Sequence, residues 1–407
     1  MRSPFQGLPR EVAVLAAVAV AVAIGFGVVA PAIPQFATSF GVGKTAAGAV
    51  VSAFALMRFV SALGGGRLVD AAGERKVLAI GIGVVAVSTG LAGLSQSYVQ
   101  LLVLRGIGGI GSAMFTISAT ALLFRVVDNS NRGRATGLFQ SGFLVGGLLG
   151  PLAGGFLTDY SLRLPFYVYA VSLIAAGSIG AVFLSSATLH RDASEPADSE
   201  AATTSLREAW SNPAYRAAVA VNFAIGWAFF GVRMSLVPLF VLESLHQSAK
   251  WTGVGFLCAS LTQIGGLALA GRFVDRSGRR PAMILGSAVA GLALALLAVT
   301  SSLAVFLLAM TALGAGGAFV STAPGAVVGD IMSGRGGRVV AVFQMASDTG
   351  VITGPLAAGW LADSLSFSAA FAACAVVLFG ATIFAIRMPE TLQVRVAASV
   401  SEETGDI

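Results

Sequence analysis

The sequence predicts an all-α membrane protein in which twelve transmembrane helices form two six-helix, pseudo-symmetric bundles. Hydrophobic residues make up 56% of the 407 residues and charged residues only 11%, against roughly 25% charged in an ordinary soluble domain. A spanning helix needs about 20 mostly apolar residues, and the chain holds enough for twelve. A soluble globule could not keep so much apolar surface from water. Soluble enzymes, secreted domains and disordered proteins are therefore excluded.

Twelve apolar blocks follow one another, six on each side of a polar interval. The first six lie near 12–36, 46–68, 77–95, 99–124, 136–158 and 165–186, and the second six near 215–240, 252–274, 282–300, 303–328, 340–362 and 367–387. Each block is expected to be helical, because the bilayer core offers no water to satisfy backbone groups. The sequence therefore predicts one bundle over 1–186, a cytoplasmic linker over 187–213, a second bundle over 214–388 and a cytoplasmic tail over 389–407.

Lys and Arg are divided unevenly between the two ends of these blocks. Nineteen of them fall on the side of the N-terminus, and three (Lys44, Arg163 and Lys250) fall on the opposite side. Cytoplasmic loops of membrane proteins collect Lys and Arg. Both termini are therefore expected in the cytoplasm, and the formal net charge of +6 is explained without a nucleic-acid partner.

The two halves share short motifs at a nearly constant offset. Gly66-Arg-Leu-Val-Asp-Ala-Ala-Gly-Glu-Arg75 returns as Gly271-Arg-Phe-Val-Asp-Arg-Ser-Gly-Arg-Arg280. Gly150-Pro-Leu-Ala-Gly-Gly-Phe-Leu-Thr-Asp159 returns as Gly354-Pro-Leu-Ala-Ala-Gly-Trp-Leu-Ala-Asp363. Several matches at one offset indicate duplication. A parallel repeat about an axis along the membrane normal places a binding site near the midplane, so the pattern favours a transporter.

These motifs resemble those of the major facilitator superfamily, and the resemblance covers nearly the whole chain. The second loop motif matches the family signature G-x-x-x-D-R-x-G-R-[RK] in full, with Gly271, Asp275, Arg276, Gly278, Arg279 and Arg280. The first motif keeps Gly66, Asp70, Gly73 and Arg75 but departs from the signature at Ala71 and Glu74.

Three further motifs are similar to those of twelve-helix drug:proton antiporters within that superfamily. Block 5 carries the antiporter motif, Gly146, Gly150, Pro151, Gly154 and Gly155. Block 4 carries Leu101-x-x-x-Arg105-x-x-Gly108-Gly109-x-Gly111, close to the fourth-helix arginine motif, and block 1 carries Pro31-x-x-Pro34. Pro389-Glu390-Thr391 after block 12 is also familiar in the superfamily.

The loop motifs predict a conformational latch. A carboxylate at a helix end can cap the positive N-terminus of a neighbouring helix. We expect Asp70 to cap helix 11, which starts near Arg338, and Asp275 to cap helix 5, which starts near Arg134. Two ion pairs, Arg75 with Asp128 and Arg279 with Asp330, would extend the latch. The alternative is a turn motif with cytoplasmic positive charge and no gating role.

Two ionisable residues inside apolar blocks are candidates for proton coupling, Arg105 and Asp348. A charge near the bilayer centre costs a few kcal/mol even on insertion scales, so it should face a cavity or a partner. The resemblance links Arg105 to proton coupling, although it could instead tie helices together through carbonyl groups. Burial would raise the pKa of Asp348 and a nearby arginine would lower it, so Asp348 could carry the proton; the alternative is a helix–helix hydrogen bond or an ion pair.

The resemblance implies that helices 1, 4, 7 and 10 line a substrate cavity. On these helices the sequence offers aromatic, amide and proline side chains and one arginine, with two further glutamines on helices 5 and 11. The candidates are Phe26, Pro31, Pro34, Gln35, Phe115, Gln140, Asn222, Trp227, Phe230, Arg233, Phe319 and Gln344. Aromatic groups with a few amides suit an amphiphilic ligand, although any one of the aromatics could instead contact lipid.

Together these features predict a secondary transporter that exports amphiphilic small molecules in exchange for protons by alternating access, as a monomer in a bacterial cytoplasmic membrane. Its partners would be the substrate, protons and lipid, with the proton gradient as energy source and no cofactor, metal or nucleic acid. The alternative within transport is a facilitator or importer of a sugar, amino acid or organic anion. A membrane enzyme is not expected, because His190 and His246 fall on opposite sides and no catalytic cluster is present.

Overall fold

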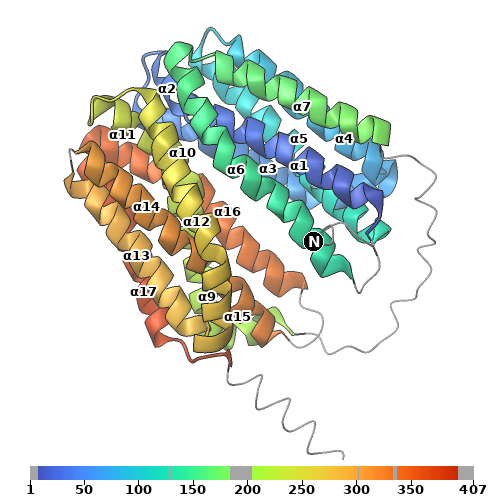
Figure 1. Cartoon of the computed structure of the whole chain (residues 1–407), viewed down its shortest axis with the longest axis vertical. Coiled ribbons are helices and arrows are strands. Elements are labelled where there is room, and N and C mark those ends of the chain that lie inside the picture. The colour runs from blue at the N-terminus through green and yellow to red at the C-terminus, as the bar shows by residue number, and fades with distance from the viewer. Residues whose placement is uncertain (1–7, 128–130, 184–203, 301, 333–336, 393–407) are drawn as a thin grey trace, which may run out of the picture. The chain divides into compact units, whose positions relative to one another are not determined.

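The computed structural model describes residues 8–127, 131–183, 204–300, 302–332 and 337–392 (Figure 1). Within these ranges every regular element is a helix, which confirms the predicted all-α class. The burial of Gly66 and the side chain of Asp70, both inside α3, are not described. Asp128 also lies outside the described residues, so its predicted ion pair with Arg75 does too.

The elements follow the predicted blocks in order. The first half contains α1 (Arg10–Val29), α2 (Ala32–Thr38), α3 (Lys44–Ala72), α4 (Glu74–Gly93), α5 (Tyr98–Val126), α6 (Arg132–Tyr160) and α7 (Leu164–Phe183). The second contains α8 (Leu206–Ser211), α9 (Pro213–Ile225), the π-helical segment η3 (Gly226–Val232), α10 (Arg233–Ser235), α11 (Val237–Glu243), α12 (Ala249–Ser277), α13 (Arg279–Val299), α14 (Leu303–Val320), α15 (Ala323–Ile331), α16 (Gly337–Ser364) and α17 (Phe367–Arg387).

Several predicted blocks consist of consecutive shorter helices. Pro31 and Pro34 lie at the junction of α1 and α2, which together form one apolar stretch, Arg10–Thr38. Among the described residues, eleven stretches are long and apolar enough to span a membrane, and α7 contains a shorter apolar helix, Leu164–Gly180. The chain is therefore a multi-pass membrane protein, as its composition predicts.

The chain divides into two compact units. The first comprises Met1–Pro196 with Val237–Leu257, and the second comprises Ala197–Leu236 with Cys258–Ile407. Helix α12 thus contributes its first residues to the first unit and the rest to the second. The sequence-based domain boundaries stay a prediction.

The antiporter motif packs α6 closely against α1 inside the first unit. A Cβ atom on Gly146 would meet Ala23, one on Gly150 would meet the carbonyl of Ile24, and one on Gly154 would meet the carbonyl of Val28. Only glycine permits backbones to approach this closely. The spacing of the motif is therefore explained by the α1–α6 contact.

The second unit contains a corresponding contact between α16 and the α9–η3 segment. A Cβ atom on Gly350 would meet the carbonyl of Phe223, and one on Gly226 would meet the carbonyl of Ser347. Gly354 approaches Trp227 in the same way. The duplicated Gly-Pro element therefore packs the fifth spanning helix of each half against the first spanning helix of the same half.

Candidate functional site

Arg105 is a buried cation in the first unit. It lies on α5 with only 3% of its surface exposed, and its guanidinium carbon lies 4.5 Å from the centre of the Phe54 ring on α3. Among the described residues its Nε atom has no hydrogen-bond partner. Burying a charge costs several kcal/mol, and a desolvated cation–π contact returns only about 2 kcal/mol. The surrounding protein therefore compensates the charge of Arg105 only in part.

The Phe54 ring that contacts this arginine is one of three neighbouring aromatic rings. Phe26 on α1 lies 6.1 Å from Phe54 and 6.4 Å from Tyr169 on α7, measured between ring centres. Tyr169 is 2% exposed and lies within electrostatic range of Arg105. Helix α3 packs closely against α5 because Gly109 on α5 lies against the Phe54 carbonyl, where any Cβ would collide. We call Arg105, Phe26, Phe54 and Tyr169 the arginine cluster.

Phe115, a predicted substrate contact, lies deeper in the same unit. It lines a cavity of about 10 Å³ together with Tyr169 and residues of α1, α4, α5 and α7. A cavity of this size holds about one water molecule. Phe115 therefore belongs to the packed interior of the bundle in this structure.

The other predicted cavity residues of the first unit differ in exposure. Pro31, Pro34 and Gln35 are buried around the α1–α2 junction, whereas Gln140 on α6 is exposed. The Nε2 atom of Gln35 has no hydrogen-bond partner among the described residues.

In the second unit the predicted cavity residues surround η3. Asn222 donates from Nδ2 to the carbonyl of Phe343 at 2.6 Å, and Trp227 donates from Nε1 to Cys374 Sγ at 3.3 Å. In this structure both side chains therefore donate hydrogen bonds to neighbouring helices, α16 and α17. Phe230 is exposed and Arg233 directly follows η3, while Phe319 packs on Phe273.

The acidic candidate Asp348 lies half-buried on α16, and Gln344 one turn earlier is exposed. The residue before Asp348, Ser347, lies against Gly226 at the start of η3. A π-helical segment inside a spanning helix frequently marks a functional position. Asp348 and η3 thus lie on adjoining parts of the second unit.

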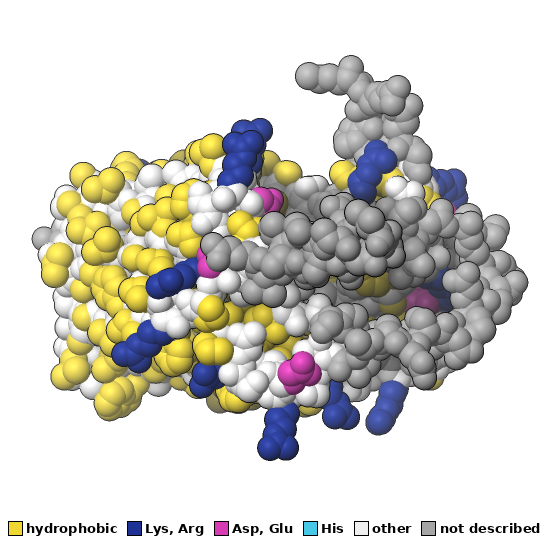
Figure 2. Space-filling view, turned by 90° about the horizontal axis from the view of Figure 1, so that it is seen from below, with side chains coloured by type: hydrophobic (Ala, Val, Ile, Leu, Met, Phe, Trp, Pro, Cys, Tyr) yellow, Lys and Arg dark blue, Asp and Glu magenta, His cyan; other side chains and the backbone are white. Residues whose placement is uncertain are grey.

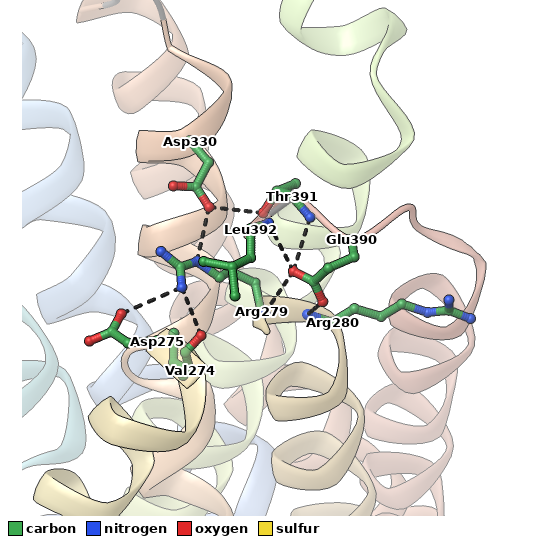
Figure 3. A network of polar contacts seen from close by, with 8 residues as sticks. All are labelled: Val274, Asp275, Arg279, Arg280, Asp330, Glu390, Thr391 and Leu392. Atoms are coloured by element: carbon green, nitrogen blue, oxygen red, sulfur yellow. Dashed lines mark hydrogen bonds and ion pairs between the residues drawn. The ribbon is translucent and has the colours of Figure 1, made fainter. Parts of the chain in front are cut away.

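The second loop motif forms a buried polar network (Figure 3). Arg279 donates from Nε to Asp330 Oδ2 at 2.9 Å, and the two side chains are 6% and 3% exposed. The Arg279 guanidinium also donates to the carbonyl of Val274 at 2.7 Å and lies 3.4 Å from Asp275. The Arg279–Asp330 ion pair that the sequence predicts is present, while the carboxylate of Asp275 is largely exposed.

The residues that follow α17 complete this network. Glu390 accepts hydrogen bonds from the backbone N–H groups of Arg279 at 2.9 Å and Arg280 at 3.0 Å, and so caps the N-terminus of α13. Thr391 donates from Oγ1 to Asp330 at 2.9 Å. The Pro389-Glu390-Thr391 sequence therefore fixes the end of the second bundle to its loop motif.

The first loop motif has a different ion pair. Arg125 at the end of α5 donates from one nitrogen to both oxygens of Glu74, at 3.1 and 2.9 Å. Glu74 is the residue at which the first motif departs from the family signature. Three further basic residues of the predicted latch, Arg134, Arg276 and Arg338, are exposed, and Arg75 is half-buried. Figure 2 shows basic side chains projecting from the described part of one face among apolar ones.

Sequence reasoning assigned no role to Asp159 at the end of α6. Its two carboxylate oxygens accept from the N–H groups of Ala249 at 2.6 Å and Lys250 at 3.2 Å, and so cap α12. Lys44 at the start of α3 and Glu243 at the end of α11 form an ion pair at 3.0 Å. The repeat of Gly150–Asp159 at Gly354–Asp363 was the available signal for Asp159, whereas Phe54 and Tyr169 carried none.

Comparison with known proteins identifies the family. The model of the Major Facilitator Superfamily matches residues 15–265 and 221–404. The chain belongs to the major facilitator superfamily. It is therefore a membrane transporter and not an enzyme.

The relatives of this chain include a multidrug resistance protein. The multidrug resistance protein MdtG of Klebsiella pneumoniae is 28% identical, over 88% of this chain and 88% of its own. An uncharacterised transporter of the same superfamily from Methanocaldococcus jannaschii is 25% identical, over 85% of this chain and 89% of its own.

Solved structures share the fold. A bacterial homologue of the human lysosomal transporter Spinster superposes with a TM-score of 0.73 at 17% identity, covering 93% of this chain and 94% of that one. A POT family transporter gives 0.76 at 12% identity, covering 94% and 96%.

Proposed function

We propose that this chain exports amphiphilic small molecules in exchange for protons by alternating access, working as a single chain in a bacterial cytoplasmic membrane with both termini in the cytoplasm. The observation that carries the proposal is Arg105, a cation buried in a spanning helix beside aromatic side chains. Ionisable groups at such positions mark substrate, ion and proton pathways. The similarity to MdtG, a multidrug resistance protein, supports the choice of drug-like substrates.

Proton coupling needs a group that binds and releases a proton during the cycle. Asp348 is the proposed carrier, because it is a half-buried carboxylate on a spanning helix next to the π-helical segment η3. Arg105 is the proposed second coupling residue. The antiporter motif supports the exchange mode, since its glycines bring α1 and α6 into direct backbone contact.

The latch remains part of the proposal. Release of the Arg279–Asp330 network would accompany a change of state at the cytoplasmic end of the second bundle. The predicted partners of Asp70 and Asp275 on helices 11 and 5 belong to this proposal as well.

The first test is transport by the purified chain in liposomes under an imposed proton gradient. An amphiphilic fluorophore should accumulate only with the gradient, and a protonophore should abolish the accumulation. Asp348→Asn should lower gradient-driven transport by about tenfold or more, because an amide cannot carry a proton at neutral pH. Asp363→Asn, at the exposed end of the same helix, is the matched control and should transport normally.

Two outcomes would contradict the proposal. Uptake that proceeds equally well without a gradient would favour the facilitator, and Asp348→Asn with unchanged pH dependence would remove Asp348 as the carrier. Either result leaves the assignment to the transporter family intact.

A further inference from the structure

The described carboxylates of the first unit bind groups other than Arg105. Among its described residues, Glu11 is paired with Arg10, Glu74 with Arg125 and Glu243 with Lys44, and Asp159 caps α12. All four lie at helix ends, whereas Arg105 lies seven residues into α5, about 10 Å along that helix. Within the described part of this unit, Arg105 therefore has aromatic neighbours and no carboxylate.

We propose that Arg105 binds the anionic group of the transported substrate within the arginine cluster, and that the substrates are amphiphilic anions such as aromatic carboxylates. The inference rests on the proposed export function and names the substrate class. The bound anion would then be the counter-charge of Arg105.

The arrangement of the cluster suits such a ligand. The Phe54 ring lies over the guanidinium at 4.5 Å and so occupies one planar face of the guanidinium. The buried Nε atom on the edge of the group has no hydrogen-bond partner among the described residues. A guanidinium edge matches a carboxylate, which it can bind through two parallel hydrogen bonds. The rings of Phe26 and Phe54 are only half-buried, and rotation of these side chains would let the apolar body of a ligand pack beside them.

The charge of the cluster selects the substrate. An organic cation placed here would meet an uncompensated positive charge in a medium of low dielectric constant, where repulsion is strong. A neutral ligand would leave the guanidinium without a counter-charge. An aromatic anion satisfies both the charge and the apolar walls, so it is the class favoured by this site.

The test measures binding to the purified full chain in lipid nanodiscs, at one fixed pH and with no gradient. Three radiolabelled probes share one ring system and differ in charge: 2-naphthoate, 2-naphthamide and 2-naphthyltrimethylammonium. We expect 2-naphthoate to bind at least about tenfold more tightly than the other two, the advantage of a charge-assisted bidentate contact. Arg105→Gln should remove this advantage and leave the weak binding of the amide unchanged.

Two further variants test whether the loss of binding is specific to the Arg105 guanidinium. Arg105→Lys keeps the charge without the planar fork and should retain part of the preference for 2-naphthoate. Arg58→Gln removes another arginine from a spanning helix of the same unit, one that is exposed on α3, and should bind 2-naphthoate like the parent. Size-exclusion chromatography confirms that each variant is folded.

The inference is overturned if the ammonium or amide probe binds as tightly as 2-naphthoate, or if Arg58→Gln and Arg105→Gln weaken binding equally. Its failure is distinguishable from failure of the proposed function. Proton-driven export of cations by the chain would leave the function standing and remove the anion site. Selective anion binding without proton-driven transport would leave the anion site standing and remove the proposed function.

Discussion

The two copies of the loop motif hold ion pairs of opposite polarity at corresponding positions. Glu74 and Arg125 lie 205 residues before Arg279 and Asp330. In the first copy the acid begins α4 and the base ends α5; in the second the base begins α13 and the acid ends α15. Duplication therefore preserved the contact between two helix ends but not the sign of the charges.

The helix dipole shows why the second copy needs more support than the first. An acid near a helix N-terminus and a base near a C-terminus are both favoured, and the first pair satisfies both preferences. The second pair opposes both. There, Glu390 supplies the missing negative charge at the start of α13, accepting from the N–H groups of Arg279 and Arg280.

Burial separates the copies further. Arg279 and Asp330 are 6% and 3% exposed, whereas Arg125 and Glu74 are 41% and 18% exposed. A buried pair is costly to break, because one charge remains behind without compensation. An exposed pair contributes little. The second motif should therefore govern the stability of its bundle far more than the first.

The largest effect is expected from Asp330→Ala. It removes the buried carboxylate that pairs with the Arg279 guanidinium, leaves only the largely exposed Asp275 carboxylate among the described acidic partners of Arg279, and removes the acceptor of Thr391. It should therefore destabilise the protein by about 3 kcal/mol. Arg125→Ala in the first copy should cost about 1 kcal/mol or less. Thermal unfolding of the purified variants in one detergent measures both. Equal losses of stability would refute the contrast drawn from burial.

The turn glycines give a second, smaller contrast. Gly73 and Gly278 both precede a helix with positive φ, 83° and 109°, and with extended ψ, 145° and 165°. Essentially only glycine adopts this conformation, so alanine costs about 1–3 kcal/mol at either position. At Gly73 nothing lies within 4 Å of an added Cβ, but at Gly278 it would meet the Glu390 carboxylate. Gly278→Ala should also disturb the α13 cap, which is worth about another 1 kcal/mol.

The same thermal assay tests this glycine pair. Glu390→Ala provides room for the new methyl group, so the extra cost of Gly278→Ala should shrink in that background. An unchanged difference between the two glycine variants in both backgrounds would show that Glu390 is not its source.

Much of the fold was predictable because the bilayer imposes its own rules. Apolar blocks of spanning length, the polar interval and the repeat predict the all-α bundle without any side-chain detail. The antiporter glycines were predictable for a similar reason, since a run of small residues at helical spacing indicates close helix contact. The pair Arg279–Asp330 follows from the loop motif.

Other parts of the site depend on contacts that no sequence pattern encodes. Phe54 and Tyr169 are ordinary aromatic residues in apolar helices, and only the packing of α3 and α7 on α5 brings them to Arg105. Phe115 lies on a helix expected to line the substrate cavity, and in this structure it lines a small cavity inside its own bundle. Glu74 was visible as a departure from the signature, but its partner Arg125 was not.

The smallest effect is expected from reversing the first ion pair. Arg125→Glu alone places two carboxylates together and should cost about 1 kcal/mol at low salt, an amount that falls as added salt screens the repulsion. The double variant Glu74→Arg with Arg125→Glu should recover most of this loss, because both positions have access to solvent. The corresponding reversal, Arg279→Glu with Asp330→Arg, should not recover, since the Val274 carbonyl and the Asp275 carboxylate, which contact the Arg279 guanidinium, would then face a carboxylate. Thermal unfolding at low and high salt distinguishes the two reversals, and a second-copy double variant as stable as the parent would show that Val274 and Asp275 do not fix the polarity of this network.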